Sequence, residues 1–294
     1  MGQNDYALAE VWNGSTWKID SPPRQPPPID GSTQTALSGV SCTSTTACVA
    51  IGYFGLIEAW NGTSWRVEPG ASLENELGIL TAVSCVAANA CTTVGWADYG
   101  LNDETRTLAE RWNGRAWTLE ATGNAGGSGQ LYGVSCSKPR ACVAVGTGLQ
   151  HSALTELWNG SSWRVQGTPT VASSPGLALT GVSCTSPDSC YAVGYQGVGT
   201  YEGTSGLAEN WNGKYWKVRP TPTPPDSGGN SQLDSISCIQ ASRDCEAVGQ
   251  RSIPSYRRRS LAEGWNGSYW RIQATPDPPG NSSLQGVSCS SVDS

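Results

Sequence analysis

The tripeptide Trp-Asn-Gly occurs six times in this chain of 294 residues, at intervals of about 50 residues. A second tryptophan follows the first by five positions in every copy, and these pairs account for 12 of the 13 tryptophans. A period of this length predicts a repeat architecture, in which each copy is one supersecondary unit that packs on its neighbours. The first tryptophans of the copies are Trp12, Trp60, Trp112, Trp158, Trp211 and Trp265.

One copy shows the plan of all six. Residues 179–184 alternate apolar with small or polar side chains and predict a strand, A. Residues 190–195, 207–211 and 216–218 predict strands B, C and D in the same way. The Asn-Gly pair between C and D favours a two-residue type I′ turn, whose two central positions both need positive φ.

Four short antiparallel strands per copy predict an all-β fold, a β-propeller of six four-stranded blades. No segment carries the 3.6-residue period of a helical solenoid. A string of independent four-stranded domains is disfavoured because each would be too small to bury its own core. We therefore expect one domain over residues 1–294.

The two ends of the chain have complementary repeat phase. The chain begins at the end of a strand B and ends just after a strand A, so we expect residues 4–20 to pack beside residues 284–289 and close the ring with a circular offset. The alternative is an excerpt of a longer repeat protein with six or more blades. The absence of a signal peptide at the N-terminus and the unpartnered Cys289 favour that alternative.

Eleven cysteines at repeated, paired spacings predict disulfides within the blades, each joining the end of strand A to the start of strand B. Zinc binding is the alternative, but the chain has one histidine and the cysteine pairs lie on different blades. We expect no metal and no cofactor. The predicted pairs are Cys42–Cys48, Cys85–Cys91, Cys136–Cys142, Cys184–Cys190 and Cys238–Cys245.

Charge and hydropathy exclude two classes of partner. The formal net charge of −6 gives no counterion release from a phosphate backbone, and the one basic run, at residues 257–259, is short, so we exclude nucleic acid. No apolar stretch approaches the length of a membrane-spanning helix. The disulfide pattern predicts a secreted, extracellular protein.

The turn between strands C and D resembles the end of the Asp-box of sialidase-like propellers, with Asn13, Gly14 and Trp17 as one example, although the upstream Ser-x-Asp is missing. The whole unit, Leu-x-Glu-x-Trp-Asn-Gly-x-x-Trp followed by Gly-Val-Ser-Cys and Cys-x-Ala-Val-Gly, resembles repeats of secreted actinobacterial β-propeller proteins of unknown function. The resemblance covers the full chain and implies a fold and a compartment.

Two repeated residue types have a structural and a functional interpretation. A glutamate stands two residues before every Trp-Asn-Gly and either accepts backbone N–H groups or forms six equivalent ligand sites. The paired tryptophans either form the core between blades or stack on sugars. We favour the structural interpretation of both. The glutamates are Glu10, Glu58, Glu110, Glu156, Glu209 and Glu263.

The loops between strands B and C differ from copy to copy, and variable loops on a regular scaffold often carry binding function. In an up-and-down blade these loops lie at one end, together with the connectors between blades. We expect any specific ligand to bind there. The candidate ligand-binding residues are Asp98, Tyr99, Asp103, Arg106, Tyr201, Glu202, Tyr256 and Arg257.

Three hypotheses about function remain open. The first is a non-catalytic binding module for extracellular polysaccharide or for a protein partner. The second is a glycan-processing enzyme, a hydrolase or lyase, whose two carboxylates would lie roughly 5–10 Å apart at the channel mouth. The third is a structural or adhesion repeat. The sequence favours a non-catalytic role because it contains no recognisable catalytic motif.

Overall fold

The strands of the computed structural model form five four-stranded antiparallel sheets and one two-stranded sheet. Each four-stranded sheet joins strands that are consecutive in sequence, so it is an up-and-down blade. The structure describes residues 9–12, 15–20, 36–71, 73, 78–98, 105–123, 127–169, 176–198, 203–225, 227–228, 230–239, 244–253, 257–276 and 278–290. The prediction of an all-β propeller is confirmed.

Blades 1 to 5 follow one another along the chain. Their A strands are β3 (Leu37–Ser44), β7 (Gly78–Ala87), β11 (Gln130–Lys138), β15 (Leu177–Ser186) and β19 (Ser231–Cys238). The B strands are β4 (Ala47–Gly52), β8 (Ala90–Asp98), β12 (Ala141–Thr147), β16 (Ser189–Val198) and β20 (Cys245–Ile253). The C strands are β5 (Ile57–Trp60), β9 (Thr105–Trp112), β13 (Ala153–Trp158), β17 (Gly203–Trp211) and β21 (Arg257–Trp265). The D strands are β6 (Trp65–Glu68), β10 (Trp117–Leu119), β14 (Trp163–Gln166), β18 (Trp216–Val218) and β22 (Trp270–Gln273).

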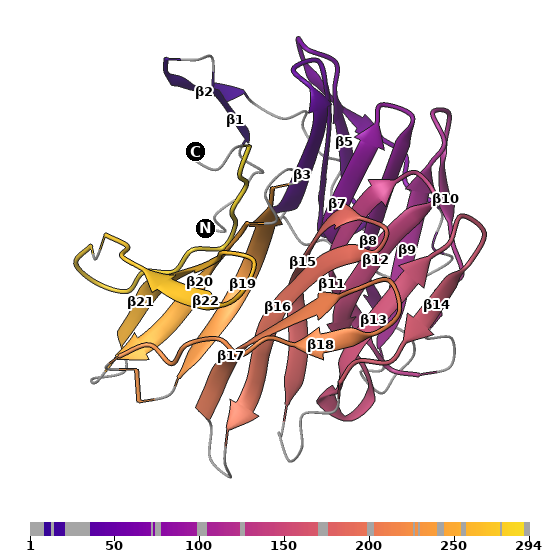
Figure 1. The fold of residues 1–294 in the computed structure, drawn as a ribbon. Helices are drawn as coiled ribbons and strands as arrows, with labels where there is room; N and C mark the ends of the chain where they lie inside the picture. Colours follow the sequence, from indigo (N-terminus) through magenta and orange to yellow (C-terminus); the bar gives the residue numbers. More distant parts are fainter. Residues whose placement is uncertain are drawn as a thin grey trace.

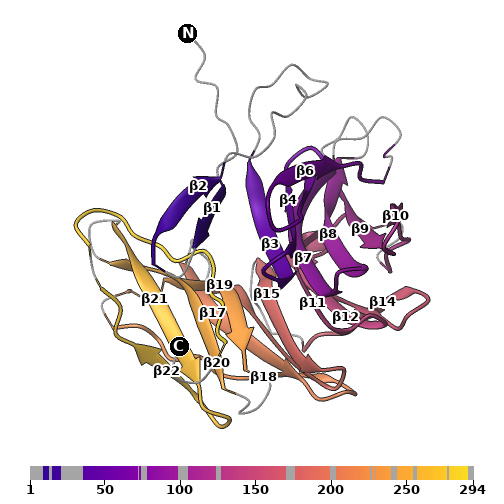
Figure 2. The ribbon, with the colours of Figure 1, turned by 90° about the horizontal axis from the view of Figure 1, so that it is seen from above.

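The A strands of successive blades contact one another and surround the axis of the ring, while the D strands lie at the outer edge (Figure 2). The described residues contain one helical element, the 3₁₀ turn η1 (Leu149–His151). No helix in the described part of the chain is long and apolar enough to cross a membrane.

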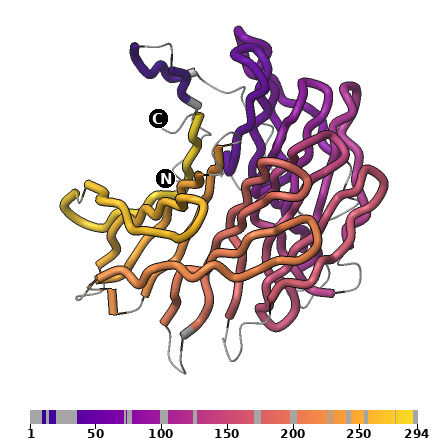
Figure 3. Tube along the Cα trace, viewed as in Figure 1, coloured from indigo at the N-terminus to yellow at the C-terminus, as the bar shows by residue number. Residues whose placement is uncertain are grey.

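The sixth position of the ring is occupied by the hairpin β1 (Ala9–Trp12) and β2 (Trp17–Asp20). It lies between blade 5 and β3, beside the C-terminal segment (Figures 1 and 3). Residues 281–290 form no ladder, although Cys289 N–H donates to Ser237 Oγ at 3.0 Å, as the A-strand cysteines of other blades do. The expected neighbours therefore meet, for residues 9–12 and 15–20. Residues 4–8 lie outside the described part.

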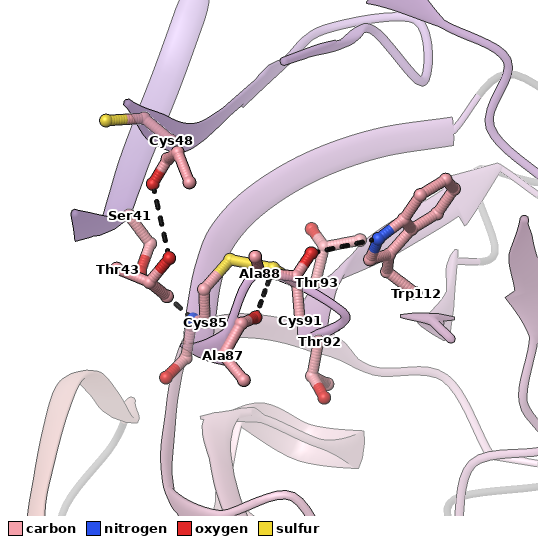
Figure 4. The surroundings of a disulfide bond; sticks show 12 residues. Ser41, Thr43, Cys48, Cys85, Ala87, Ala88, Cys91, Thr92, Thr93 and Trp112 are labelled. Carbon is pink, nitrogen blue, oxygen red and sulfur yellow. Dashed lines mark hydrogen bonds between the residues drawn. A yellow bond between two sulfur atoms is a disulfide. The ribbon is translucent and has the colours of Figure 1, made fainter. Parts of the chain in front are cut away.

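The repeated Ser-Cys dipeptide links consecutive blades. Ser41 Oγ accepts a hydrogen bond from the backbone N–H of Cys85 in the next blade (Figure 4). The same bond recurs at each described junction between A strands, at 2.9–3.0 Å. Because each serine precedes a disulfide cysteine, one dipeptide fixes both the hairpin of its own blade and the register of the next.

The five predicted disulfides are all present. Each joins two residues that face each other directly in the A–B ladder, with Cα atoms 3.9–4.0 Å apart. The strand-B cysteine of each disulfide also faces the tryptophan that ends strand C, as Cys142 faces Trp158. The A–B hairpin and the C–D turn therefore lie at the same end of each blade, the turn face. The B–C loops and connectors lie at the other end, the loop face, as expected.

The Asn-Gly turn is not the predicted type I′ turn. Trp60 faces Trp65, so the loop between them has four residues, 61–64. Asn61 Oδ1 accepts hydrogen bonds from the backbone N–H groups of Thr63 and Ser64 at 2.9 and 3.0 Å. Gly62 has a φ of 94°, whereas no asparagine among the described residues has a positive φ. The asparagine side chain organises the turn, so only the glycine adopts a left-handed conformation.

The tryptophan pairs form the core between blades, as expected. Trp211 and Trp216 pack with Val143 and Val145 of the preceding blade and are 5% and 3% exposed. The centroids of paired rings lie 5.6–5.7 Å apart in a tilted arrangement. The exceptions are blade 1, whose Trp60 and Trp65 are half-buried, and the hairpin β1–β2, whose Trp12 and Trp17 are 50% and 65% exposed. The hairpin therefore lies in the sixth position without burying its tryptophans.

Candidate functional site

Three of the eight candidate ligand-binding residues lie in the described part of the chain. Asp98 ends β8 and is exposed. Arg106 is the second residue of β9, and Arg257 begins β21 and is exposed. All three are at the loop-face ends of their strands, as expected. The other five lie outside the described residues: Tyr99, Asp103, Tyr201, Glu202 and Tyr256.

These three residues do not belong to one site. Asp98 and Arg106 are in blade 2, and Arg257 is in blade 5. Blades 3 and 4 lie between them in the ring (Figure 2). A small ligand at Arg257 therefore contacts a different part of the loop face from a ligand at Asp98.

A more concentrated group of polar residues follows from a bulge in strand A. The A–B register shifts by one residue near the loop face of each of blades 1 to 5, as between Leu80 and Ala82. A bulge re-aims the extra residue and is common beside functional sites. The residues at the shift are Ser38, Thr81, Tyr132, Thr180 and Asp234.

In three blades the residue at the bulge is structural. Thr180 Oγ1 donates to the carbonyl oxygen of Leu233 in the next blade at 2.6 Å and lies 3.2 Å from that of Val193. Ser38 and Thr81 make the equivalent contacts in blades 1 and 2. The bulge also explains the repeated glycine of strand B, because a Cβ on Gly194 would overlap the carbonyl oxygen of Ala178.

Blades 3 and 5 break this pattern with Tyr132 and Asp234. Tyr132 Oη donates to Oε1 of Gln130 at 2.6 Å. Asp234 Oδ1 accepts a hydrogen bond from Nε2 of Gln232 at 2.8 Å, while its Oδ2 is buried and has no partner. The hydrogen bonds that the structure shows for these two side chains stay within their own strands, unlike that of Thr180.

The bulges of blades 3, 4 and 5 lie close together. A Cβ on Gly133 would lie 3.1 Å from the carbonyl oxygen of Thr180, and one on Gly181 would lie 3.1 Å from Cα of Ser235. The backbones of β11, β15 and β19 are therefore in near contact at this level. Tyr132 and Asp234 flank Thr180 at the inner side of the ring.

Neighbouring side chains influence the pKa values of Tyr132 and Asp234. Burial raises the pKa of Tyr132, and the neighbouring Tyr195 of β16 raises it further. Burial raises the pKa of the Asp234 carboxyl, against the hydrogen bond from Gln232 and the positive charge of Arg258, which lower it. We call Gln130, Tyr132, Tyr195, Gln232 and Asp234 the axial cluster.

Sequence reasoning missed the axial cluster because it looked for irregular residues only in the B–C loops. The signal is present in strand A. When the six copies are aligned on Ser-Cys, the fourth residue before the cysteine is Ser38, Thr81, Tyr132, Thr180, Asp234 and Gln285. Tyrosine and aspartate replace small hydroxyl residues there, which marks blades 3 and 5 as different.

The repeated glutamates are structural in the blades where a partner is found. Glu110 Oε2 accepts the backbone N–H of Ala71 at 2.8 Å, and Glu156 Oε2 accepts that of Gly123 at 2.7 Å. Each donor belongs to the connector that leaves the preceding blade. The five glutamates of blades 1 to 5 are at most 1% exposed, so they form no open ligand site. The described residues contain no group of three His, Cys, Asp or Glu that could hold a metal ion.

No family model matches the chain, and no curated protein matches it. Solved structures do. A mutant of the Aleuria aurantia lectin in complex with Fucα1-6GlcNAc is 12% identical, with a TM-score of 0.51 over 92% of this chain and 88% of that one. The fold of the present chain is a β-propeller. The SapL1 lectin in complex with α-methyl fucoside is also 12% identical, with a TM-score of 0.51 over 83% and 81% of the two chains.

A second structure of the Aleuria aurantia lectin, described as a six-bladed β-propeller, is 13% identical, with a TM-score of 0.49 over 90% of this chain and 85% of that one. At this level of identity the likeness concerns the path of the backbone. It carries no residue of a sugar site over to this propeller.

Proposed function

We propose that this protein is a non-catalytic, extracellular carbohydrate-binding module, formed by a single propeller domain over residues 1–294. Its ligand binds on the loop face, over the axial cluster. The observation that carries the proposal is the group of two carboxamides, two phenols and one carboxyl at the inner strands of blades 3 to 5, with Asp234 Oδ2 buried and unpartnered.

The chemistry of the axial cluster suits a sugar. Saccharide hydroxyls donate and accept hydrogen bonds, and carboxamides, phenols and carboxylates supply partners of both kinds. An aromatic ring can also lie against the apolar face of a sugar. Two lectins that share the fold were solved with fucose-containing ligands, so the backbone arrangement is compatible with such a role.

A binding role is favoured over glycoside hydrolysis because hydrolysis ordinarily needs a pair of carboxyl groups flanking the scissile bond. The axial cluster has one carboxyl, that of Asp234. Asp98 belongs to blade 2, away from the strands that carry the cluster. The five disulfides support an extracellular location, because such bonds persist in oxidising compartments.

The test is a glycan-array screen of the oxidised protein, followed by affinity measurements on the best glycan. Asp234→Asn and Tyr132→Phe should each weaken binding about tenfold or more, because a hydrogen bond to a charged or buried polar group contributes roughly 1.5–3 kcal/mol. Asp188→Asn and Tyr215→Phe, on the turn face, are the matched controls and should bind normally. Unchanged binding by both axial variants would place the site elsewhere.

A further inference from the structure

Blade 5 carries an unusual concentration of positive charge at its loop-face end. Four arginines lie within residues 251–259, which contain no acidic residue, in a chain with 18 basic and 24 acidic residues. They lie on β20 and β21 and pair across one ladder. We call Arg251, Arg257, Arg258 and Arg259 the basic hairpin.

The ladder brings like charges together. Arg251 faces Arg259 directly, next to the pairs of Ser252 with Arg258 and Ile253 with Arg257. Like charges directly opposite each other destabilise an antiparallel pair. A local conflict of this kind in an otherwise consistent repeat is expected at functional or strained sites.

The two facing arginines are held in place by uncharged acceptors. Arg251 Nη1 donates to the carbonyl oxygen of Pro225 at 2.9 Å. Arg259 Nη1 donates to those of Pro278 at 2.6 Å and Gly280 at 3.2 Å. Both connectors beside blade 5 therefore fix guanidinium groups, and carbonyl oxygens orient these groups without neutralising their charge.

The other two arginines are exposed. Arg257 and Arg258 are at the start of β21, and within the described ranges no carboxylate forms an ion pair with either of them. Arg258 lies close enough to Asp234 of the axial cluster for its charge to oppose the rise that burial causes in the pKa of that carboxyl. The β19–β20 ladder gives the same proximity, because Arg251 faces Ser231, three residues before Asp234, and Gln250 faces Gln232. The basic hairpin and Asp234 are therefore neighbouring parts of the loop-face end of blade 5.

We propose that the ligand is an acidic saccharide, whose carboxylate or sulfate groups bind Arg257 and Arg258 while its hydroxyl groups bind the axial cluster. This proposal rests on the proposed function and names its ligand class. Arginine suits such groups because its planar fork donates two parallel hydrogen bonds to a carboxylate or sulfate. The chain's net charge of −6 opposes non-specific attraction of polyanions elsewhere on the molecule.

The experiment measures binding of oligogalacturonate, dextran sulfate and neutral dextran by calorimetry, at salt concentrations between about 50 and 500 mM. We expect at least one acidic probe to bind about tenfold or more tightly than dextran, and its affinity to fall with salt. Binding of oligogalacturonate alone assigns the site to carboxylates, and binding of dextran sulfate alone assigns it to sulfates. Either result supports the proposal.

The variant Arg257→Gln/Arg258→Gln tests the residues. It should lose about tenfold or more in affinity for the acidic probe and should lose most of the salt dependence. The matched control is Arg115→Gln/Arg164→Gln, two exposed arginines on blades 2 and 3, which should change the affinity by less than about twofold. Thermal unfolding of both variants checks that the blades remain folded.

Three results would overturn the proposal: equal affinity for dextran and the acidic probes, unchanged binding by the Arg257→Gln/Arg258→Gln variant, or equally tight binding of duplex DNA through the same arginines. The proposed function fails separately. A neutral glycan that binds in an Asp234-dependent manner, with no preference for acidic probes, leaves carbohydrate binding intact and removes only the acidic ligand.

Discussion

Glu156 accepts a hydrogen bond from the backbone N–H of Gly123, 2.7 Å away and across a blade boundary. Gly123 is six residues after Trp117, and Ala71, which donates to Glu110, is six residues after Trp65. The donor position is therefore fixed by the repeat. A carboxylate of one blade holds the connector of the blade before it.

The same position is a proline before blades 4 and 5. Pro169 is six residues after Trp163, and Pro222 is six residues after Trp216. Proline has no N–H to donate. Both carboxyl oxygens of Glu209 and of Glu263 are correspondingly buried without a partner. Burial raises the pKa of each of these carboxyls to about 8, and Glu246 contributes to the rise at Glu263.

Stability should therefore fall as the pH rises from about 5 to about 8. In the unfolded chain these glutamates ionise near their usual pKa of 4.5, whereas in the fold they keep their protons until about pH 8. The native state binds more protons over this window, so each group lowers the free energy of unfolding by up to about 1.4 kcal/mol per pH unit. Urea unfolding at several pH values measures the slope.

The variant Glu209→Gln/Glu263→Gln identifies the groups responsible. Glutamine has the same shape and does not titrate, so the slope between pH 5 and 8 should become markedly shallower. Some slope should remain, because burial also raises the pKa of Glu110, Asp234 and Glu246. An unaltered slope in the double variant would contradict the assignment. Asp188→Asn, an exposed carboxyl on the turn face, is the control.

Ala71→Pro should create in blade 2 the environment that blades 4 and 5 already have. The substitution removes the N–H that Glu110 accepts and leaves the carboxyl buried, which costs roughly 1–3 kcal/mol. The loss of stability should be larger at pH 8 than at pH 5, because the unpaired carboxyl stays neutral in acid. Ala71→Ser keeps the N–H and serves as the control. Equal losses at both pH values would indicate backbone strain instead.

The sequence predicted the blade because each of its signals is periodic and local. The Ser-Cys and Trp-Asn-Gly motifs placed the disulfides, the strand order and the buried tryptophans correctly. The prediction of a type I′ turn was wrong because the side chain of Asn61 accepts hydrogen bonds from backbone N–H groups of the loop. The Asn-Gly dipeptide alone does not distinguish this interaction from a preference of the asparagine backbone for positive φ.

The axial cluster could not be predicted from the alternation of strand A alone. A bulge adds one residue without changing the polar and apolar types around it, so Asp234 looks like an ordinary outward-facing position. Arg258, whose charge acts on Asp234, comes from β21, two strands away in the same blade. Tyr195, which acts on Tyr132, comes from β16 of the next blade, so only the packing of blades 3 and 4 brings that pair near.

Removing the Cys184–Cys190 disulfide as Cys184→Ser/Cys190→Ser should lower the free energy of unfolding by about 2 kcal/mol. The bond closes a loop of sequence separation 6, and the loop-entropy model gives a modest gain for so short a loop. Strands β15 and β16 should still pair, because their backbone ladder continues on both sides of the cysteines. The contact with blade 3 should also remain, because the hydrogen bond from Cys184 N–H to Ser135 Oγ involves only the backbone of Cys184. Denaturant unfolding of the oxidised variant measures the change. A loss above about 5 kcal/mol would exceed what this model allows.

The turn glycines separate backbone strain from steric overlap. Gly267 has a φ of 88° and open space around its Cβ position, whereas a Cβ on Gly62, with a φ of 94°, would lie 2.7 Å from Cγ2 of Thr46 in the A–B turn. Gly267→Ala should therefore cost only the left-handed backbone energy, about 1–2 kcal/mol. Gly62→Ala should cost more, and Gly62→Ala/Thr46→Ser, which removes the overlapping methyl group, should recover the difference. Thermal and urea unfolding of the three variants checks this order. Equal losses of stability for Gly62→Ala and Gly267→Ala would show that steric overlap between the two turns of a blade contributes nothing.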